Sequence, residues 1–406
     1  MLVLPARTRV AWGWDMATGL LAGAYMGCIW TFVGRVARAD LRASDAQMGW
    51  IAAAPALGYL FATVWARQME GRAKLPFVYW TWLAARGLFM LAPLVRTREQ
   101  LAVLVCLSPF VFSVSTPAYT SVMKDIYPDD HRGRLMSVVR IGMSVVTLVC
   151  SLMMGRLLDA GLNWRVAFAF GGACGALSAL TFSRIAVPAP KEETPGLPVR
   201  AFLGDTLAIL RRNPGYRWFT ASVFVYGFGN LMATTLYPMY QVDRFHVTNT
   251  QVANLQNIAS VSTIAGFFYW GWFMDRKGPL ITVLLCIGVV CLMPLFYAVA
   301  RDVSLLYLAA AAGGIAMSGI DLGYLNTTLL FSEPGRAAQY QALHSSFFGI
   351  RGSIAPHCAV PLQEHVGMRP AFAIALLIML AGTALQVVSM RGYRGQQAAR
   401  RRGAPV

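Results

Sequence analysis

Twelve apolar runs of membrane-spanning length constrain the fold of this chain more than any other feature. They lie at 14–34, 47–66, 76–95, 101–122, 135–158, 165–187, 217–240, 251–273, 279–299, 303–331, 339–362 and 369–390. About 20 apolar residues suffice for a helix to cross the hydrocarbon core of a bilayer. The runs are continuous rather than alternating, which favours helices over barrel strands. We therefore predict an all-α membrane protein.

The charges support this interpretation. Charged residues make up only 13% of the 406 residues, whereas soluble proteins carry about 25%. The net charge of +17 indicates either nucleic-acid binding or anchoring at a membrane surface. Nucleic-acid binding needs a basic face on an exposed fold, but these cations lie in short segments between the apolar runs. The pattern favours the lipid bilayer as partner and predicts no nucleic acid.

A proline-rich segment separates the runs into two sets of six. The sequence VPAPKEETPGLPVR (Val187–Arg200) has a composition that does not build a packed core. The next residues, AFLGDTLAILRRN, suit a helix in the headgroup plane or an ordinary connecting helix. We predict an N-terminal six-helix bundle (1–187), a cytoplasmic linker with an interfacial helix (188–215), a C-terminal six-helix bundle (216–390) and a basic cytoplasmic tail (391–406).

The distribution of Lys and Arg predicts the orientation. The N-terminus, the even-numbered loops and the C-terminal tail hold 22 of these residues, and the odd-numbered loops hold 10. Cytoplasmic loops carry the excess of positive charge, so we expect both termini in the cytoplasm. The strong preference for Arg over Lys is typical of GC-rich prokaryotic genomes. We therefore expect a multi-pass protein of a prokaryotic inner (cell) membrane, and a monomer.

The two sets of spans also repeat. A shift of 207 residues places Gly71 on Gly278 and Gly142 on Gly349, at the same position in the six-span order of each half. Such parallel repeats are known in transporters. The repeat predicts two six-helix bundles related by a pseudo-two-fold axis.

A charged turn between the eighth and ninth spans carries a recognisable motif. The segment Gly271-Trp-Phe-Met-Asp275-Arg276-Lys277-Gly278 has glycines for helix approach and for a turn that a Cβ would strain, and an acid suited to a helix N-terminus. In a twelve-span chain, G-x-x-x-D-R-x-G resembles the major facilitator superfamily. The resemblance implies a cytoplasmic gate that includes Gly271, Asp275, Arg276 and Gly278.

The resemblance continues in the first half. The equivalent loop keeps Gly71 and Arg72 but has Gln68 and Met69 where the family has Asp and Arg, so the gate is expected to be asymmetric. The family's P-x-x-x-R-G-R pattern begins at Pro128 and adds Arg132, Gly133 and Arg134 to the predicted gate. Arg132 and Arg134 either meet Asp275 or act only as positive-inside anchors.

One departure from the family bears on function. Drug/proton antiporters of this superfamily carry G-x-x-x-G-P-x-x-G-G in span five, whereas Gly142–Gly155 reads GMSVVTLVCSLMMG without a Gly-Pro pair. This departure weighs against a proton-driven drug exporter. Efflux of hydrophobic drug-like compounds is retained as an alternative.

Charged residues inside the spans are the candidates for a substrate site, because each costs at least about 2.5 to 3.5 kcal/mol at a helix centre. Asp321 lies about 15 Å and Arg351 about 18 Å from the cytoplasmic edge. In the family fold, their spans and that of Arg140 line or flank a central cavity. Because Arg binds carboxylate and phosphate in a two-pronged manner, we hypothesise a small anionic substrate.

The alternative is a buried structural pair of Asp321 and Arg351, with Arg140 reaching to the cytoplasmic surface. Arg86, on a peripheral span, is expected to be structural. Uncharged polar residues that complete the candidate pathway, each with helix packing as the alternative, are Tyr119, Tyr226, Asn230, Asn257 and Asn326.

The sequence does not decide which gradient drives transport. Asp321 is the only acid well inside a span, and His344 and His357 titrate near neutral pH when unperturbed, so H+ is one hypothesis for a coupling ion. If Asp321 is locked to Arg351, facilitated diffusion or exchange is favoured instead.

Taken together, the sequence predicts a secondary active or facilitative transporter of a small solute that works by alternating access. No phosphate loop, nucleophile elbow or H-E-x-x-H motif is present, and the seven cysteines lie inside apolar runs without metal-ligand spacing. We therefore expect no enzyme activity, no cofactor and no metal. A transporter-like membrane sensor that does not transport is the second alternative.

Overall fold

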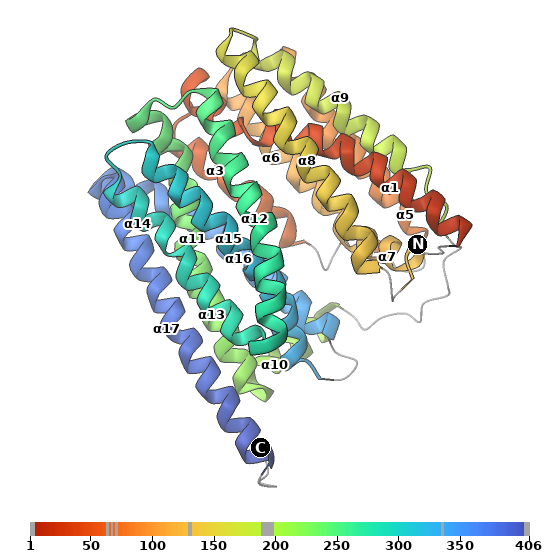
Figure 1. Ribbon diagram of the computed structural model, residues 1–406, viewed down its shortest axis with the longest axis vertical. Coiled ribbons are helices and arrows are strands. Elements are labelled where there is room, and N and C mark those ends of the chain that lie inside the picture. The colour runs from red at the N-terminus through yellow and green to blue at the C-terminus, as the bar shows by residue number, and fades with distance from the viewer. Residues whose placement is uncertain are drawn as a thin grey trace. The chain divides into compact units, whose positions relative to one another are not determined.

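The computed structural model describes residues 5–61, 65, 68–69, 72–128, 132–187, 199–333 and 337–401 (Figure 1). All regular structure in these ranges is helical. The predicted all-α fold is therefore confirmed. The first part of the predicted linker, residues 188–198, and the last five residues of the predicted tail lie outside the described ranges.

The first half of the chain begins with a long, irregular helix. α1 (Ala6–Tyr25) continues through two π-helical turns, η1 (Met26–Trp30) and η2 (Val36–Asp40), with α2 (Val33–Arg35) between them. The elements that follow are α3 (Asp45–Tyr59), α5 (Lys74–Gly87), the 3-10 helix η3 (Leu88–Leu94), α6 (Arg98–Ser113), α7 (Ser115–Ile126), α8 (Arg132–Asp159) and α9 (Trp164–Phe182).

The second half starts with a short connecting helix, α10 (Val199–Arg212). The elements after it are α11 (Pro214–Phe245), α12 (Asn249–Lys277), α13 (Pro279–Val290), α14 (Leu292–Val299), α15 (Ser304–Phe331), α16 (Ala337–Val366) and α17 (Met368–Arg401). The predicted spans other than the second coincide with one helix or with consecutive helices, and the second, 47–66, coincides with α3 as far as Tyr59 and then includes residues outside the described ranges. Eight of the described helical segments are long and apolar enough to cross a membrane.

Local sequence signals explain several helix ends. Ser44 with Gln47, before α3, and Thr97 with Gln100, before α6, form reciprocal capping boxes, which satisfy backbone N–H groups that have no partner inside the helix. Gly278 precedes α13 with a φ of 84°, a conformation that a side chain would strain.

The chain forms two compact units. Unit 1 comprises residues 1–196 and 241–257, and unit 2 comprises residues 197–240 and 258–406. The helices α11 and α12 therefore each contribute to both units. The connection between these two helices belongs to unit 1.

Glycines bring two helices of unit 1 together. Gly19, Gly23 and Gly27 lie one turn apart on the same face of the first helix, and a Cβ at any of them would collide with α8. The Thr147 hydroxyl donates a hydrogen bond to the Gly23 carbonyl at 3.1 Å. Small residues allow such close backbone approach in membranes, and α1, α8 and α9 run side by side (Figure 1).

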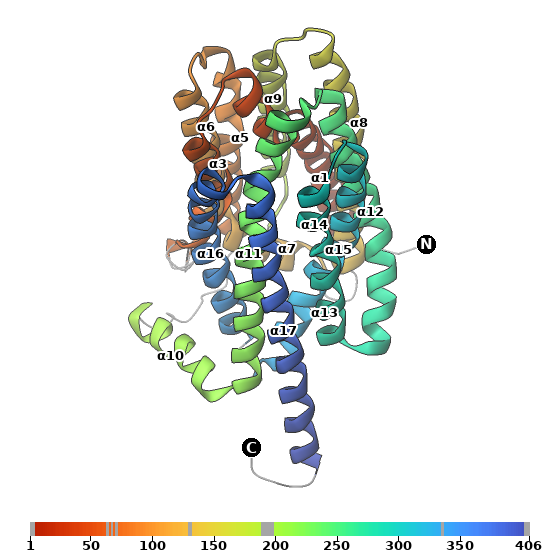
Figure 2. The same cartoon turned by 90° about the vertical axis from the view of Figure 1, so that its left-hand side faces the viewer.

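Unit 2 packs around an aromatic core. Tyr216, Phe219 and Tyr226 of α11 share this core with apolar residues of α13 and α15. A Cβ at Gly382 of α17 would collide with the backbone of Tyr226, so α17 lies directly against α11. The basic end of α10 precedes α11, and α10 runs across the direction of α11 and α17 (Figure 2).

Candidate substrate site

Unit 2 contains a cavity of about 210 Å³ among α11, α15 and α16. Its lining includes four residues of the predicted pathway, which are Tyr226, Asn230, Asp321 and Arg351. The other lining residues are Gly227, Leu231, Met317, Ile320, Tyr324, His344 and Phe348. Three helices thus bring predicted polar residues from distant parts of the sequence to one cavity.

Arg351 is the buried cation of this cavity. Its side chain is only 5% exposed, its Nη1 donates a hydrogen bond to the carbonyl of Val223 on α11, and its Cζ lies 5.4 Å from the centre of the Phe348 ring. A Cβ on Gly227 would overlap with the guanidinium. The absence of a side chain at Gly227 therefore allows the cation to lie directly on the backbone of α11.

Two lining residues carry buried polar atoms without a hydrogen-bond partner in the described part of the chain. These atoms are Nε of Arg351 and the hydroxyl oxygen of Tyr226, whereas the buried Tyr324 hydroxyl interacts with the Arg351 side chain. Most buried polar groups in proteins are paired, so each exception calls for a physical explanation. Two such groups belong to residues that line one cavity.

Asp321 and Arg351, the acid and the cation on the cavity lining, differ in solvent exposure. Asp321 on α15 is exposed, whereas Arg351 on α16 is buried. Tyr324 follows Asp321 by nearly one helical turn, and its ring packs edge-on against His344 with 5.0 Å between the centroids. The cavity thus has a carboxylate on one wall and a guanidinium on another.

The predicted pathway did not include Gly227, Tyr324 and Phe348 of this lining, and it considered His344 only as a titratable group. His344, Phe348 and Arg351 are spaced at i, i+4 and i+7, which places them on one face of α16. Tyr324 relates to Asp321 in the same way on α15. This helical spacing would have found the three side chains, whereas the requirement for Gly227 depends on a residue of another helix.

Three other predicted pathway residues belong to unit 1. Arg140 on α8 is exposed and lies within electrostatic reach of the Asp15 carboxylate. Tyr119 on α7 is half-buried and packs on Trp82, with 5.5 Å between ring centroids. Asn257 is buried, and its Oδ1 accepts a hydrogen bond from Ser151 at 2.9 Å.

Asn326 belongs to unit 2 but is not among the residues that line the 210 Å³ cavity. Its Nδ2 donates to the carbonyl of Leu322 on its own helix at 2.7 Å. The cavity therefore includes four of the eight predicted pathway residues, and the other four lie elsewhere in the two units.

Asp15, near the start of the first apolar run, is a buried acid. It is 4% exposed, and the Tyr127 hydroxyl donates a hydrogen bond to its Oδ2 at 2.7 Å. The partner follows α7 in the sequence, so the pair joins two segments of unit 1 that are 112 residues apart.

Arg86 lies in an aromatic environment away from the unit 2 cavity. Its Cζ is 4.1 Å from the centre of the Trp82 ring, and its Nη1 donates to the Ser178 hydroxyl. The side chain is 6% exposed. These contacts agree with the structural role that was expected.

The predicted gate is described only in part. Gly278 has the left-handed backbone expected of it, and Asp275 and Arg276 are exposed, with the guanidinium of Arg276 over the Trp272 ring at 4.4 Å. One expectation is wrong: a Cβ on Gly271 would meet no atom within 4 Å, so this glycine allows no close helix approach in this structure.

In the first half of the chain, Arg72 is exposed, and Met69, at the position of the family's arginine, is buried in the core of unit 1. Gly71 lies outside the described residues. The backbone at Arg132, Gly133 and Arg134 begins α8, but their side chains are outside the description.

The fold agrees with comparisons to known proteins. Residues 16–356 and 222–404 match the sequence profile of the Major Facilitator Superfamily. A comparison with curated proteins finds no match.

Several solved transporter structures are similar to this chain. A point mutant of the nucleoside transporter NupG has 13% identity and a TM-score of 0.76, with 93% of this chain and 99% of that chain covered. The human organic anion transporter MFSD10 has 15% identity, a TM-score of 0.68 and coverages of 94% and 100%. A bacterial homologue of the human lysosomal transporter Spinster has 16% identity, a TM-score of 0.66 and coverages of 96% and 98%.

The profile match extends over most of the chain and includes both sets of spans. The chain therefore belongs to the major facilitator superfamily, a family of membrane transporters of small solutes.

Proposed function

We propose that this protein is a secondary active or facilitative transporter that moves a small solute by alternating access, and that Arg351 binds an anionic group of the solute. The observation that carries this proposal is the buried guanidinium of Arg351 on the lining of the unit 2 cavity. A buried cation needs either a counter-charge or a strongly polar ligand.

The surrounding groups favour a ligand rich in oxygen acceptors. A buried donor without a partner costs about 1 to 3 kcal/mol, and Arg351 and Tyr226 each carry one unpartnered polar atom within the described residues. A carboxylate or phosphate group offers several acceptor oxygens and forms charge-assisted hydrogen bonds with guanidinium.

The size of the cavity weighs against the drug-efflux alternative. Its volume is about 210 Å³, whereas pockets for drug-sized ligands span about 300 to 1,000 Å³. Six of its lining residues have polar or charged side chains, which are Tyr226, Asn230, Asp321, Tyr324, His344 and Arg351. A small polar solute fits this description better than a large hydrophobic one.

The similarity to an organic anion transporter agrees with this proposal, but at 15% identity it is a likeness of fold. The nucleoside transporter is also similar to this chain in fold alone, and its name points to a different class of substrate. The choice of an anion therefore rests on Arg351 and its neighbours rather than on the comparisons.

A binding experiment with three molecules of nearly equal shape tests the charge preference. We expect benzoate to raise the unfolding temperature of the purified protein, and neutral benzamide and cationic benzamidine to raise it less or not at all. Equal shifts from all three, or the largest shift from benzamidine, would contradict the proposal of an anionic substrate.

Two variants locate the binding site. Arg351→Ala should abolish the benzoate shift while the protein remains folded, and Arg140→Ala should weaken it if the cation of unit 1 also contacts the solute. Normal benzoate binding in both variants would rule out an anion site at these arginines.

Transport is separated from sensing by a flux measurement. We expect proteoliposomes that contain the wild-type protein to accumulate radiolabelled benzoate, and those with Arg351→Ala to match empty liposomes. A protein that binds benzoate without moving it would support the alternative of a transporter-like sensor.

Proton coupling through Asp321 is a separate proposal. The carboxylate is exposed and lines the cavity, so proton exchange with water is physically accessible. If Asp321 carries the coupling proton, an imposed pH gradient should drive uptake in wild-type protein but not in Asp321→Asn. If uptake ignores the gradient in both proteins, facilitated diffusion or exchange is the better description.

We further propose an inner-membrane location in a prokaryote, cytoplasmic termini and a monomeric state. The excess of Lys and Arg in the even-numbered loops supports this orientation. Fusion of a reporter that is active only in the cytoplasm to the C-terminus should give signal, whereas fusion after residue 246 should not.

A further inference from the structure

The cavity of unit 2 has opposite charges on two of its walls. Arg351 on α16 is buried, Asp321 on α15 is exposed, and both line the same volume of about 210 Å³. Tyr324 lies within electrostatic reach of both charged groups. A solute that occupies this small cavity is therefore near a cation and an anion at the same time.

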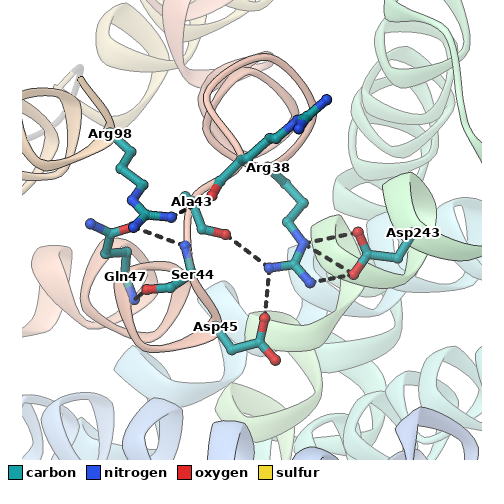
Figure 3. Close-up of polar contacts among 8 residues, drawn as sticks. Arg38, Ala43, Ser44, Asp45, Gln47, Arg98 and Asp243 are labelled. Carbon is teal, nitrogen blue, oxygen red and sulfur yellow. Dashed lines mark hydrogen bonds and ion pairs between the residues drawn. The ribbon is translucent and has the colours of Figure 1, made fainter. Parts of the chain in front are cut away.

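Arg38 of unit 1 shows, by contrast, how the protein itself can compensate a guanidinium (Figure 3). Its Nε lies 2.9 and 3.0 Å from the two carboxylate oxygens of Asp243, and its Nη2 donates to the same carboxylate at 2.6 Å. Arg351 instead contacts two neutral groups, the Val223 carbonyl and the Tyr324 hydroxyl. Its Nε has no hydrogen-bond partner within the described residues. These contacts position the guanidinium but do not compensate its charge.

Asp159 of unit 1 is the corresponding example for a carboxylate. It accepts hydrogen bonds from the backbone N–H groups of Asn249 at 2.9 Å and Thr250 at 2.8 Å, which lie at the start of α12, where N–H groups have no partner inside the helix. The side chain of Asn249 also accepts a hydrogen bond from Arg35 at 2.9 Å. Asp321 lies in the interior of α15, where N–H groups bond within the helix. Its carboxylate therefore interacts with side chains, water or a bound solute rather than with its own backbone.

The two charges distinguish between classes of solute. A solute with only a negative charge is attracted by Arg351 and repelled by Asp321, and a solute with only a positive charge meets the reverse. A zwitterion makes a favourable contact at both residues. Its carboxylate accepts charge-assisted hydrogen bonds from the guanidinium, and its ammonium group donates them to the aspartate.

The size of the cavity limits the distance between the two charges of such a solute. The volume of about 210 Å³ is below the range of about 300 to 1,000 Å³ that drug-sized ligands require. The carboxylate and the ammonium group must therefore be joined by a short chain. Small amino acids have both groups and this size.

From this arrangement we propose that the solute is a small amino acid in its zwitterionic form, with its carboxylate at Arg351 and its ammonium group at Asp321. The proposal rests on the proposed function, because it uses the anion site at Arg351 and adds the chemical class of the whole solute. It gives Asp321 a role in binding at equilibrium, which is measured without a pH gradient and is therefore separate from proton coupling.

Matched pairs of short acids test this proposal. Each pair consists of an amino acid and a hydroxy acid of the same chain length, from glycine and glycolate to 5-aminopentanoate and 5-hydroxypentanoate. The two members share the carboxylate and differ in the charge at the other end. Affinities are measured by titration of the unfolding temperature of the purified protein at neutral pH. In at least one pair, we expect the amino acid to bind about tenfold more tightly than the hydroxy acid, or better.

The variant Asp321→Asn locates the ammonium site. It keeps the size of the side chain and removes its charge, so we expect both members of that pair to bind equally. The hydroxy acid should bind at least as tightly as to wild type, because its repulsion by Asp321 is removed. Arg351→Ala should abolish binding of both members. Asp302→Asn, which alters an exposed acid before α15, is the control and should keep the preference of the wild type.

Two results would overturn the proposal. In the first, no amino acid of the series binds more tightly than its hydroxy acid. In the second, the preference for the amino acid is the same in Asp321→Asn as in wild type, which would place the ammonium group elsewhere.

Benzoate separates these results from a failure of the proposed function. Benzoate binding that requires Arg351, without any preference for amino acids, would reject the zwitterion and keep the anion site. Absence of binding by benzoate and by every acid of the series would reject both. If an amino acid binds through Asp321 and Arg351 but does not enter proteoliposomes, transport is rejected while the chemical class of the ligand stands.

Discussion

Arg351 of α16 lies directly on the backbone of α11 at Gly227, where a Cβ would overlap with the guanidinium, and its Nη1 donates to the carbonyl of Val223. The cation is therefore positioned by a missing side chain as well as by its hydrogen bond. This contact sets the position of the guanidinium on the cavity lining.

The variant Gly227→Ala should displace the guanidinium. We expect benzoate binding to weaken at least tenfold, or about 1.4 kcal/mol, measured by titration of the unfolding temperature with benzoate. The substitution should not destabilise α11 as a helix, because Ala is favoured over Gly within helices by about 0.5 to 1 kcal/mol.

Gly288→Ala is the matched control, because a Cβ at this glycine of α13 would meet no atom within 4 Å. It should leave benzoate binding unchanged. If Gly227→Ala also lowers the unfolding temperature, adding Arg351→Ala should restore it by removing the overlap. Unaltered binding in Gly227→Ala would show that the guanidinium does not depend on this glycine.

Tyr127→Phe should destabilise unit 1. The variant removes the hydroxyl that donates to the buried Asp15 carboxylate at 2.7 Å, and a buried acceptor that loses its donor costs about 1 to 3 kcal/mol. The unfolding temperature, followed by tryptophan fluorescence, should fall. Tyr269→Phe, at a residue that is 52% exposed, should not change it, and an equal fall in both variants would assign the effect to something other than Asp15.

Arg86→Met tests whether the second buried cation is structural. Ser178 keeps a partner without Arg86, because its hydroxyl donates to the Gly175 carbonyl at 2.6 Å, and replacing a buried charge with an apolar side chain is often neutral or stabilising by about 1 to 4 kcal/mol. We expect an unchanged or higher unfolding temperature and unchanged benzoate binding. Loss of binding in a folded Arg86→Met protein would instead give this residue a part in ligand recognition.

Asp159→Ala should loosen the start of α12. Loss of a carboxylate that caps helical N–H groups costs about 0.5 to 2 kcal/mol, and the exposure of Asp159 favours the lower end of that range. Asp159→Asn keeps an acceptor oxygen and should cost less. The unfolding temperatures of both variants test which is less stable. A larger decrease in Asp159→Asn than in Asp159→Ala would argue against the capping role.

Much of the fold follows from the sequence because spanning helices need long apolar runs, and such runs have few alternative structures in a bilayer. Arg351 and Asp321 can be identified for a related reason, since charges are rare inside such runs. Both line one cavity of unit 2, and their assignment to the transport pathway stays a prediction.

The remaining features depend on contacts between distant residues. Nothing near Gly227 in the sequence indicates that Arg351 occupies the space of its side chain. Arg38 and Asp243 are 205 residues apart, and each lies at a helix end, where charged residues are common. At Gly271 the sequence suggested a contact that the structure does not show. The family motif predicted close helix packing at this glycine, but a Cβ there would meet no atom within 4 Å.

The division of α11 and α12 between the two compact units affects how the chain is assembled during synthesis. Residues 241–257 complete unit 1, yet they are translated after the linker and after most of α11. The first six spans therefore leave the ribosome without the segment that pairs with Arg35, Arg38 and Asp159. A protein cut at residue 190 and co-expressed as two fragments should thus reassociate, and the first fragment expressed alone should be less stable than in the intact chain.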